Sequence, residues 1–114
     1  MVTNADRRYW GEFTGIEDIT SEYFENGEKP DIKDTEVLFA SLWSGGYEEG
    51  MIVVFERDGQ LLVAESSHCS CNGFEWCPAP ITFGALAMER LSCHEPEARE
   101  ALHALCAARK DQRV

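Results

Sequence analysis

The chain has 114 residues, 44% of them hydrophobic and 27% charged, and its ten basic and 21 acidic side chains give a net charge of −11. This length is typical of one domain, which we place at residues 1–114, and the apolar content is sufficient for a folded core. The charge argues against direct binding of nucleic acid, because phosphate contacts need clustered Lys and Arg, and it disfavours anionic membrane surfaces for the same reason.

The first predicted element is an amphipathic helix over residues 14–26, TGIEDITSEYFEN. Thr14 and Glu17 have the spacing of a capping box, apolar residues recur at helical intervals, and Gly27 with Pro30 ends the pattern. Its outward face is acidic, formed by Glu17, Asp18, Glu22 and Glu25. Residues 12–36 hold nine acids and two lysines, a local charge of −7 that either keeps the surface solvated or steers basic partner proteins toward it.

Three strands are predicted next, over residues 36–43, 51–57 and 61–66, from their β-branched and aromatic content. The Asp58-Gly59 pair is typical of a two-residue turn between antiparallel strands. The three strands are therefore expected to form a β-meander.

Two helices follow in the C-terminal part, over residues 82–92 with Thr82 as cap and over residues 96–110 beginning at Pro96. The expected fold is α+β: a three-stranded antiparallel β-meander packed against an N-terminal helix and two C-terminal helices.

Thiol and imidazole side chains concentrate in the run SHCSCNGFEWCPAP, which we expect to be a loop beginning after Ser66. Such groups are preferred zinc ligands, and a tetrahedral site is predicted from His68, Cys69, Cys71 and Cys77, with Cys93 or His94 as alternatives to His68. The C-x-C spacing departs from the common C-x₂₋₄-C pairs. Two alternatives stay open: cysteines packed as small hydrophobes, and a nucleophilic Cys69 or Cys71 in a thiol-dependent enzyme.

Two aromatic residues are candidates for contact with a partner. Tyr47 stands beside Glu48 and Glu49 at a predicted hairpin tip, where exposed aromatic side chains often bind other proteins. Trp76 either seals the cysteine-rich loop onto the sheet or acts as an exposed anchor. Common catalytic and nucleotide-binding motifs, such as GxxxxGK[ST], GxGxxG, HExxH and GxSxG, are absent from the sequence.

No apolar run approaches the about 20 residues that span a bilayer, and residues 1–13 lack the hydrophobic core of a signal peptide. Five cysteines in a protein of this kind favour thiols or metal thiolates over disulfides. We therefore expect a cytoplasmic protein.

The run VFERDGQLLVAESSHCSCNGFEW, residues 54–76, resembles a group of small proteins encoded by tailed bacteriophages. The similarity covers roughly residues 37–76, and its most distinctive part is the His-Cys-Ser-Cys segment. The group typically has a Gln-Trp-Glu-Pro-like stretch where this chain has Glu75-Trp76-Cys77-Pro78, so Cys77 departs from the pattern. The resemblance implies a phage source and a host-cell context, and no reaction.

From these features we expect a non-enzymatic protein that binds and modulates a host protein with a basic surface, for example a defence or nucleic-acid-handling factor. The alternatives are a zinc-ordered structural or adaptor module and a thiol-dependent enzyme that uses Cys69 or Cys71, and the expected cofactor is none or zinc. The expected contact residues are Glu17, Asp18, Glu22, Glu25, Tyr47, Glu48, Glu49 and Trp76.

Overall fold

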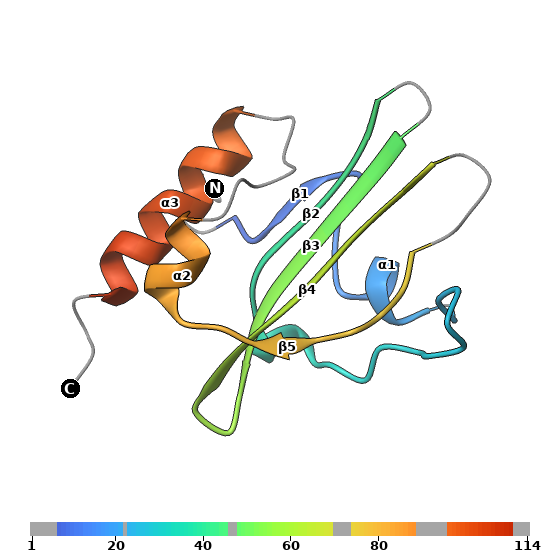
Figure 1. Cartoon of the computed structure of the whole chain (residues 1–114), viewed down its shortest axis with the longest axis horizontal. Coiled ribbons are helices and arrows are strands. Elements are labelled where there is room, and N and C mark those ends of the chain that lie inside the picture. The colour runs from blue at the N-terminus through green and yellow to red at the C-terminus, as the bar shows by residue number, and fades with distance from the viewer. Residues whose placement is uncertain (1–6, 22, 46–47, 70–73, 89–95, 111–114) are drawn as a thin grey trace.

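One five-stranded mixed sheet, in the order β1-β2-β3-β4-β5, organises the chain (Figure 1). The computed structural model describes residues 7–21, 23–45, 48–69, 74–88 and 96–110. The strands are β1 (Tyr9–Gly11), β2 (Val37–Gly45), β3 (Glu48–Arg57), β4 (Gln60–Cys69) and β5 (Ala79–Pro80). The helices are α1 (Glu17–Thr20), the 3₁₀ helix η1 (Asp34–Glu36), α2 (Phe83–Met88) and α3 (Pro96–Lys110). The predicted α+β class is confirmed.

The predicted three-stranded sheet is wrong, because β1 and β5 extend the antiparallel β2-β3-β4 array at its two edges. The Asp58-Gly59 turn lies where the sequence predicts it, with φ of 53° and 80°, as a two-residue turn of type I′ requires. β4 does not end at Ser66 but continues to Cys69, which pairs with Glu48 of β3. Pairing with a neighbouring strand thus extends regular structure into the predicted loop.

Strand β1 runs parallel to β2. It is not predicted from the sequence, because three residues are too few to show the alternation that indicates a strand. Gly11 makes the close approach possible: its φ is +66°, and a Cβ atom there would lie 1.9 Å from the carbonyl oxygen of Leu42. The next residue also bonds to β2, since the Glu12 amide donates to the same oxygen at 2.9 Å.

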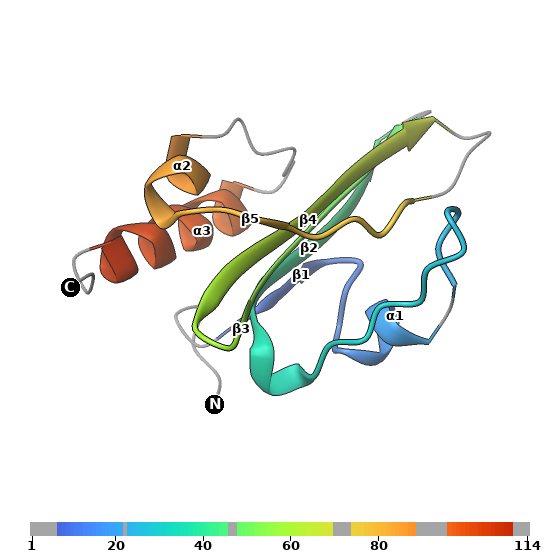
Figure 2. The same cartoon turned by 60° about the horizontal axis from the view of Figure 1, so that its bottom comes forward.

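Both faces of the sheet are covered, so the molecule has three layers (Figure 2). α2 and α3 cover one face, where Ile52 and Val54 of β3 are buried. α1 and the chain leading to β2 cover the other face, which buries Met51, Val53 and Phe55. Successive strand residues point to opposite faces, so this double cover explains why five consecutive residues of β3 are all buried.

The predicted N-terminal helix over residues 14–26 is wrong in extent, since α1 covers four residues, Glu17–Thr20. Backbone groups beyond α1 bond elsewhere: the Glu25 amide donates to the Phe74 carbonyl at 2.7 Å, and the Phe24 amide to the Glu28 carbonyl at 2.7 Å. The predicted capping box is also wrong, because Asp18 and not Glu17 accepts the hydrogen bonds of Thr14. Tertiary bonds therefore replace the helical ones that the periodicity suggests.

The predicted cap of α2 and the predicted bounds of α3 are both confirmed. The Thr82 hydroxyl accepts a hydrogen bond from the Ala85 amide at 3.0 Å, which confirms Thr82 as the cap of α2. α3 has the predicted bounds, and Ala98, Leu102 and Cys106 are buried on its inner side. The end of the predicted helix over residues 82–92 lies outside the described residues.

Candidate functional site

An open pocket of about 240 Å³ lies on the sheet face that α1 covers. Leu42 and Met51, cross-strand neighbours in β2 and β3, belong to its lining. The rest of the lining comes from α1 and from segments before and after it in the sequence. The apolar residues are Phe13, Ile19, Tyr23, Phe24, Leu42, Met51 and Phe74, and the charged ones are Asp18 and Glu25. The site thus joins an apolar, aromatic interior to two carboxylates.

Asn26 fixes one wall of the pocket to the chain that follows β4. Its side-chain amide donates to the Trp76 carbonyl at 3.1 Å and accepts from the Trp76 amide at 3.3 Å. The Glu25–Phe74 backbone hydrogen bond continues this attachment, and the Glu75 amide donates to the Ser66 hydroxyl at 3.1 Å. The pocket wall is therefore held in place before any ligand arrives.

Trp76 lies behind the pocket in the core, with 7% of its surface exposed. Its ring stacks on Phe55 with centroids 6.0 Å apart and meets the edge of Phe24 at 5.6 Å. Of its two predicted roles, this position corresponds to sealing the segment onto the sheet. Phe24 thus packs against Trp76 and also lines the pocket.

The mouth of the pocket is exposed and negatively charged. Asp18, Tyr23 and Glu25 are all exposed, with Tyr23 at 73%. Hydrogen bonds from the Thr14 amide and hydroxyl, at 2.6 and 2.8 Å, lower the pKa of Asp18, so this carboxylate stays ionised well below neutral pH. The Lys29 ammonium lies 5.6 Å from the centroid of the Tyr23 ring, outside the pocket lining.

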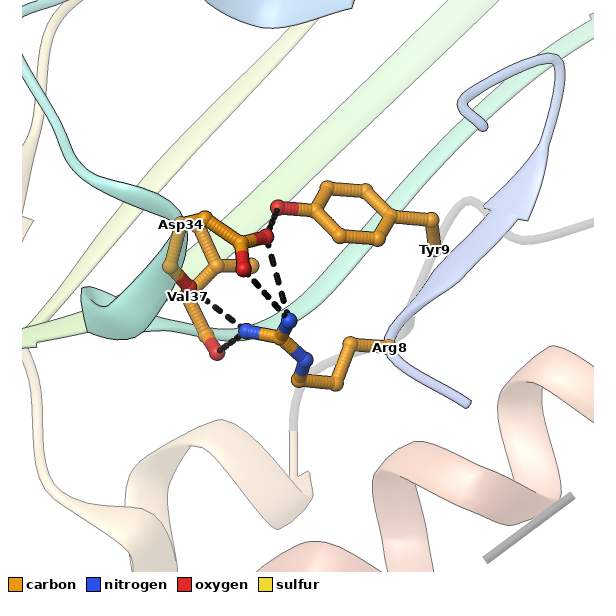
Figure 3. A network of polar contacts seen from close by, with 4 residues as sticks. All are labelled: Arg8, Tyr9, Asp34 and Val37. Atoms are coloured by element: carbon orange, nitrogen blue, oxygen red, sulfur yellow. Dashed lines mark hydrogen bonds and ion pairs between the residues drawn. The ribbon is translucent and has the colours of Figure 1, made fainter. Parts of the chain in front are cut away.

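Arginines neutralise two of the other acids. Arg8 donates to both carboxylate oxygens of Asp34, at 3.0 and 2.9 Å, and to the carbonyl of Val37 at 3.0 Å, while the Tyr9 hydroxyl donates to Asp34 at 2.7 Å (Figure 3). These bonds lower the pKa of Asp34, whereas burial and the neighbouring carboxylate raise the pKa of Tyr9. The network ties β1 to η1 and has a structural role.

Arg57 holds Glu36 in the same two-pronged way, with both bonds at 3.0 Å, and lowers the pKa of Glu36 to about 2. In the part of the chain that the structure describes, Glu17, Asp18 and Glu25 form no ion pair. The acids next to the pocket therefore keep their charge available to a partner.

The predicted zinc site cannot be assembled from the described residues. His68 and Cys69 belong to β4, where they pair with Glu49 and Glu48, and Cys71, Cys93 and His94 lie outside the described residues. Cys77 is an exposed thiol whose sulfur accepts a hydrogen bond from the Asn26 amide at 3.4 Å. Within the described ranges no group of three or more His, Cys, Asp or Glu could hold a metal ion, and zinc binding stays a prediction.

The structure brings only some of the predicted contact residues together. Asp18 and Glu25 meet at the pocket, and Glu17 is exposed beside Asp18 on α1. Glu49 lies two residues before Met51 and so on the same face of β3, while Glu48 begins that strand. Glu22 and Tyr47 lie outside the described residues. Sequence reasoning missed the apolar lining, because its residues are far apart in the chain.

Compared with protein families, curated proteins and solved structures, the chain shows no match to any of them. Among the helices of the described residues, none has the length and apolar character needed to cross a membrane.

Proposed function

We propose that the protein is a non-enzymatic binding protein whose acidic layer docks onto a basic surface of a partner protein. The observation that carries this proposal is the separation of charge between the two outer layers. Residues 12–36 hold nine acids and two lysines, and the described part of this segment runs over one face of the sheet. α3, on the opposite face, has two acids and three bases. One side of the molecule is therefore strongly negative.

Unpaired carboxylates are what such docking needs. Asp34 and Glu36 are occupied by Arg8 and Arg57, but Asp18 and Glu25 are exposed, and neither has a cationic partner within the described residues. A surface of one sign raises the association rate with an oppositely charged partner and rejects acidic ones.

The resemblance to tailed-phage proteins supports a host protein as that partner, for example a defence or nucleic-acid-handling factor with a basic surface. Factors that hold nucleic acid do so with clustered Lys and Arg, and an acidic layer would compete for the same residues. In the proposed activity, the protein modulates its partner by occupying the partner's basic surface, which needs no chemical step.

Affinity capture from a bacterial lysate, followed by titration with the purified captured protein, tests the proposal. The bait is the wild-type chain, the double variant Asp18→Asn/Glu25→Gln, or the matched control Glu97→Gln/Glu100→Gln on α3. A basic partner should be retained by wild type and control and weakened in the pocket-side variant. Retention should also fall steeply between about 50 and about 500 mM salt. Equal retention by all three baits, or binding that ignores salt, would overturn the proposal.

A further inference from the structure

We propose that the pocket between α1, residues 23–25, Phe74 and strands β2 and β3 is an anchoring site for one arginine side chain of the partner. This inference rests on the proposed function and names the group that the acidic layer selects. It follows from three properties of the pocket: its size, its aromatic walls and the sign of the charge at its mouth.

The size suits one long side chain. The cavity volume of about 240 Å³ lies below the range of about 300–1,000 Å³ that is usual for drug-sized ligands and cofactors. Its inner lining includes Phe13, Ile19 and Met51, each at most 4% exposed, so the aliphatic part of an inserted side chain would leave water. A short polar side chain would leave that apolar interior unfilled.

The aromatic walls favour a planar cation. Tyr23, Phe24 and Phe74 line the pocket, and a guanidinium stacks on aromatic faces more readily than an ammonium does. The chain provides an internal example of this attraction, since the Lys29 ammonium lies 5.6 Å from the centroid of the exposed Tyr23 ring.

The charge at the mouth completes the match. Among the described residues, Asp18 and Glu25 are the charged members of the lining, and no Lys or Arg belongs to it. One oxygen of Asp18 accepts both hydrogen bonds of Thr14, which fixes the exposed carboxylate in position. A fork of N–H donors can meet such carboxylates with charge-assisted hydrogen bonds, which a lysine ammonium reproduces less well.

The site is also organised in advance. The hydrogen bonds of Asn26 to the Trp76 backbone, and of the Glu25 amide to the Phe74 carbonyl, hold together the two segments that carry the walls. A binding site that is already ordered loses less conformational entropy when it is filled, which favours a small anchor of a single side chain.

The test uses three blocked tripeptides, acetyl-Gly-X-Gly-amide with arginine, citrulline or lysine as X, titrated into the ¹⁵N-labelled full chain at constant ionic strength. The arginine peptide should shift amide signals of Leu42, Met51 and Glu25. Citrulline, which keeps the shape and loses the charge, should bind at least about tenfold more weakly, and lysine should fall between them. Equal binding of citrulline, or shifts confined to α3, would overturn the inference.

Three variants locate the binding. Asp18→Asn/Glu25→Gln should weaken the arginine peptide at least about tenfold. Tyr23→Ala should weaken it severalfold without a loss of stability, because the ring is 73% exposed. Glu97→Gln/Glu100→Gln should bind like wild type, and a weakening as large as that of the pocket variant would contradict the pocket.

The outcomes separate this inference from the proposed function. If the arginine peptide does not bind at the pocket but a basic partner is still retained in a salt-dependent way, the anchor is wrong and the docking surface stands. If the partner is not retained either, both proposals fail.

Discussion

Replacing Gly11 by alanine tests the parallel pairing of β1 with β2, the part of the sheet that gave no sequence signal. Gly11 combines two constraints: its φ is left-handed, at +66°, and a Cβ atom added to it would lie 1.9 Å from the carbonyl oxygen of Leu42. That oxygen belongs to the backbone of β2 and cannot rotate away, so the strands themselves must separate.

The expected loss follows from three contributions. A Cβ in the left-handed region costs about 1–2 kcal/mol. The Cβ must retreat by about 1.1 Å, from 1.9 to 3.0 Å, which breaks the 2.9 Å hydrogen bond from Glu12 to Leu42, worth about 1 kcal/mol. The same movement loosens Trp10, which is fully buried. After the entropy that alanine removes from the unfolded chain, about 0.4–1 kcal/mol, the net destabilisation should be about 2 kcal/mol, and more to the extent that Trp10 loses contacts.

Two other glycines provide matched controls. Gly27 has a φ of +82° with no heavy atom within 4 Å of its Cβ position, so Gly27→Ala carries only the conformational cost, about 1 kcal/mol net. Gly15 has neither constraint, and Gly15→Ala should be neutral or stabilising by up to about 1 kcal/mol.

Urea unfolding followed by tryptophan fluorescence measures all three variants, with thermal melting as a second probe. Gly11→Ala should lower Tm by about 10 °C or more, and well beyond the shift for Gly27→Ala. If the two variants are equally destabilised, the close contact between β1 and β2 does not exist, and the reasoning for the parallel strand is wrong.

Three further outcomes are expected. Glu36→Gln should lower the free energy of unfolding at pH 7, and this effect should disappear as the pH falls from 4.5 toward 2. Because Arg57 lowers the pKa of Glu36 to about 2, the ionised Glu36 contributes its full stabilisation above its ordinary pKa and loses it as it becomes protonated. Urea unfolding at pH 7, 4 and 2.5 checks this. Asn26→Ala should cost about 1–2 kcal/mol in thermal unfolding, since the hydrogen bonds to the Trp76 backbone are lost, and a neutral result would contradict that attachment. Cys106 should react with iodoacetamide only when urea unfolds the chain, because it is buried and burial raises its pKa, and fast alkylation in native buffer would contradict its place in the core.

Local patterns in the sequence predicted the elements whose stability comes from near neighbours. The Asp58-Gly59 turn, the strands on either side of it and α3 were found because turn residues, β-branched runs and a capped amphipathic helix are short-range signals. The concentration of acids over residues 12–36 is equally a property of the sequence, since it follows from composition alone.

Periodicity misled where long-range bonds compete with local ones. Residues 14–26 have helical spacing, yet the amide of Glu25 bonds to Phe74, 49 positions later, and the helix stops at Thr20. Helical propensity is a weak preference per residue, so a few tertiary hydrogen bonds and a buried aromatic contact outweigh it.

The sequence by itself determined the α+β class, the central hairpin, the C-terminal helix and the acidic character of residues 12–36. Tertiary structure alone decided that β1 and β5 join the sheet, that the described acids of residues 12–36 lie over one face of it, and that Asp18, Glu25, Met51 and Phe74 meet around one pocket. The reason is physical: turn and helix signals act over a few residues, whereas strand edges and pockets form from segments that only the packed sheet brings together.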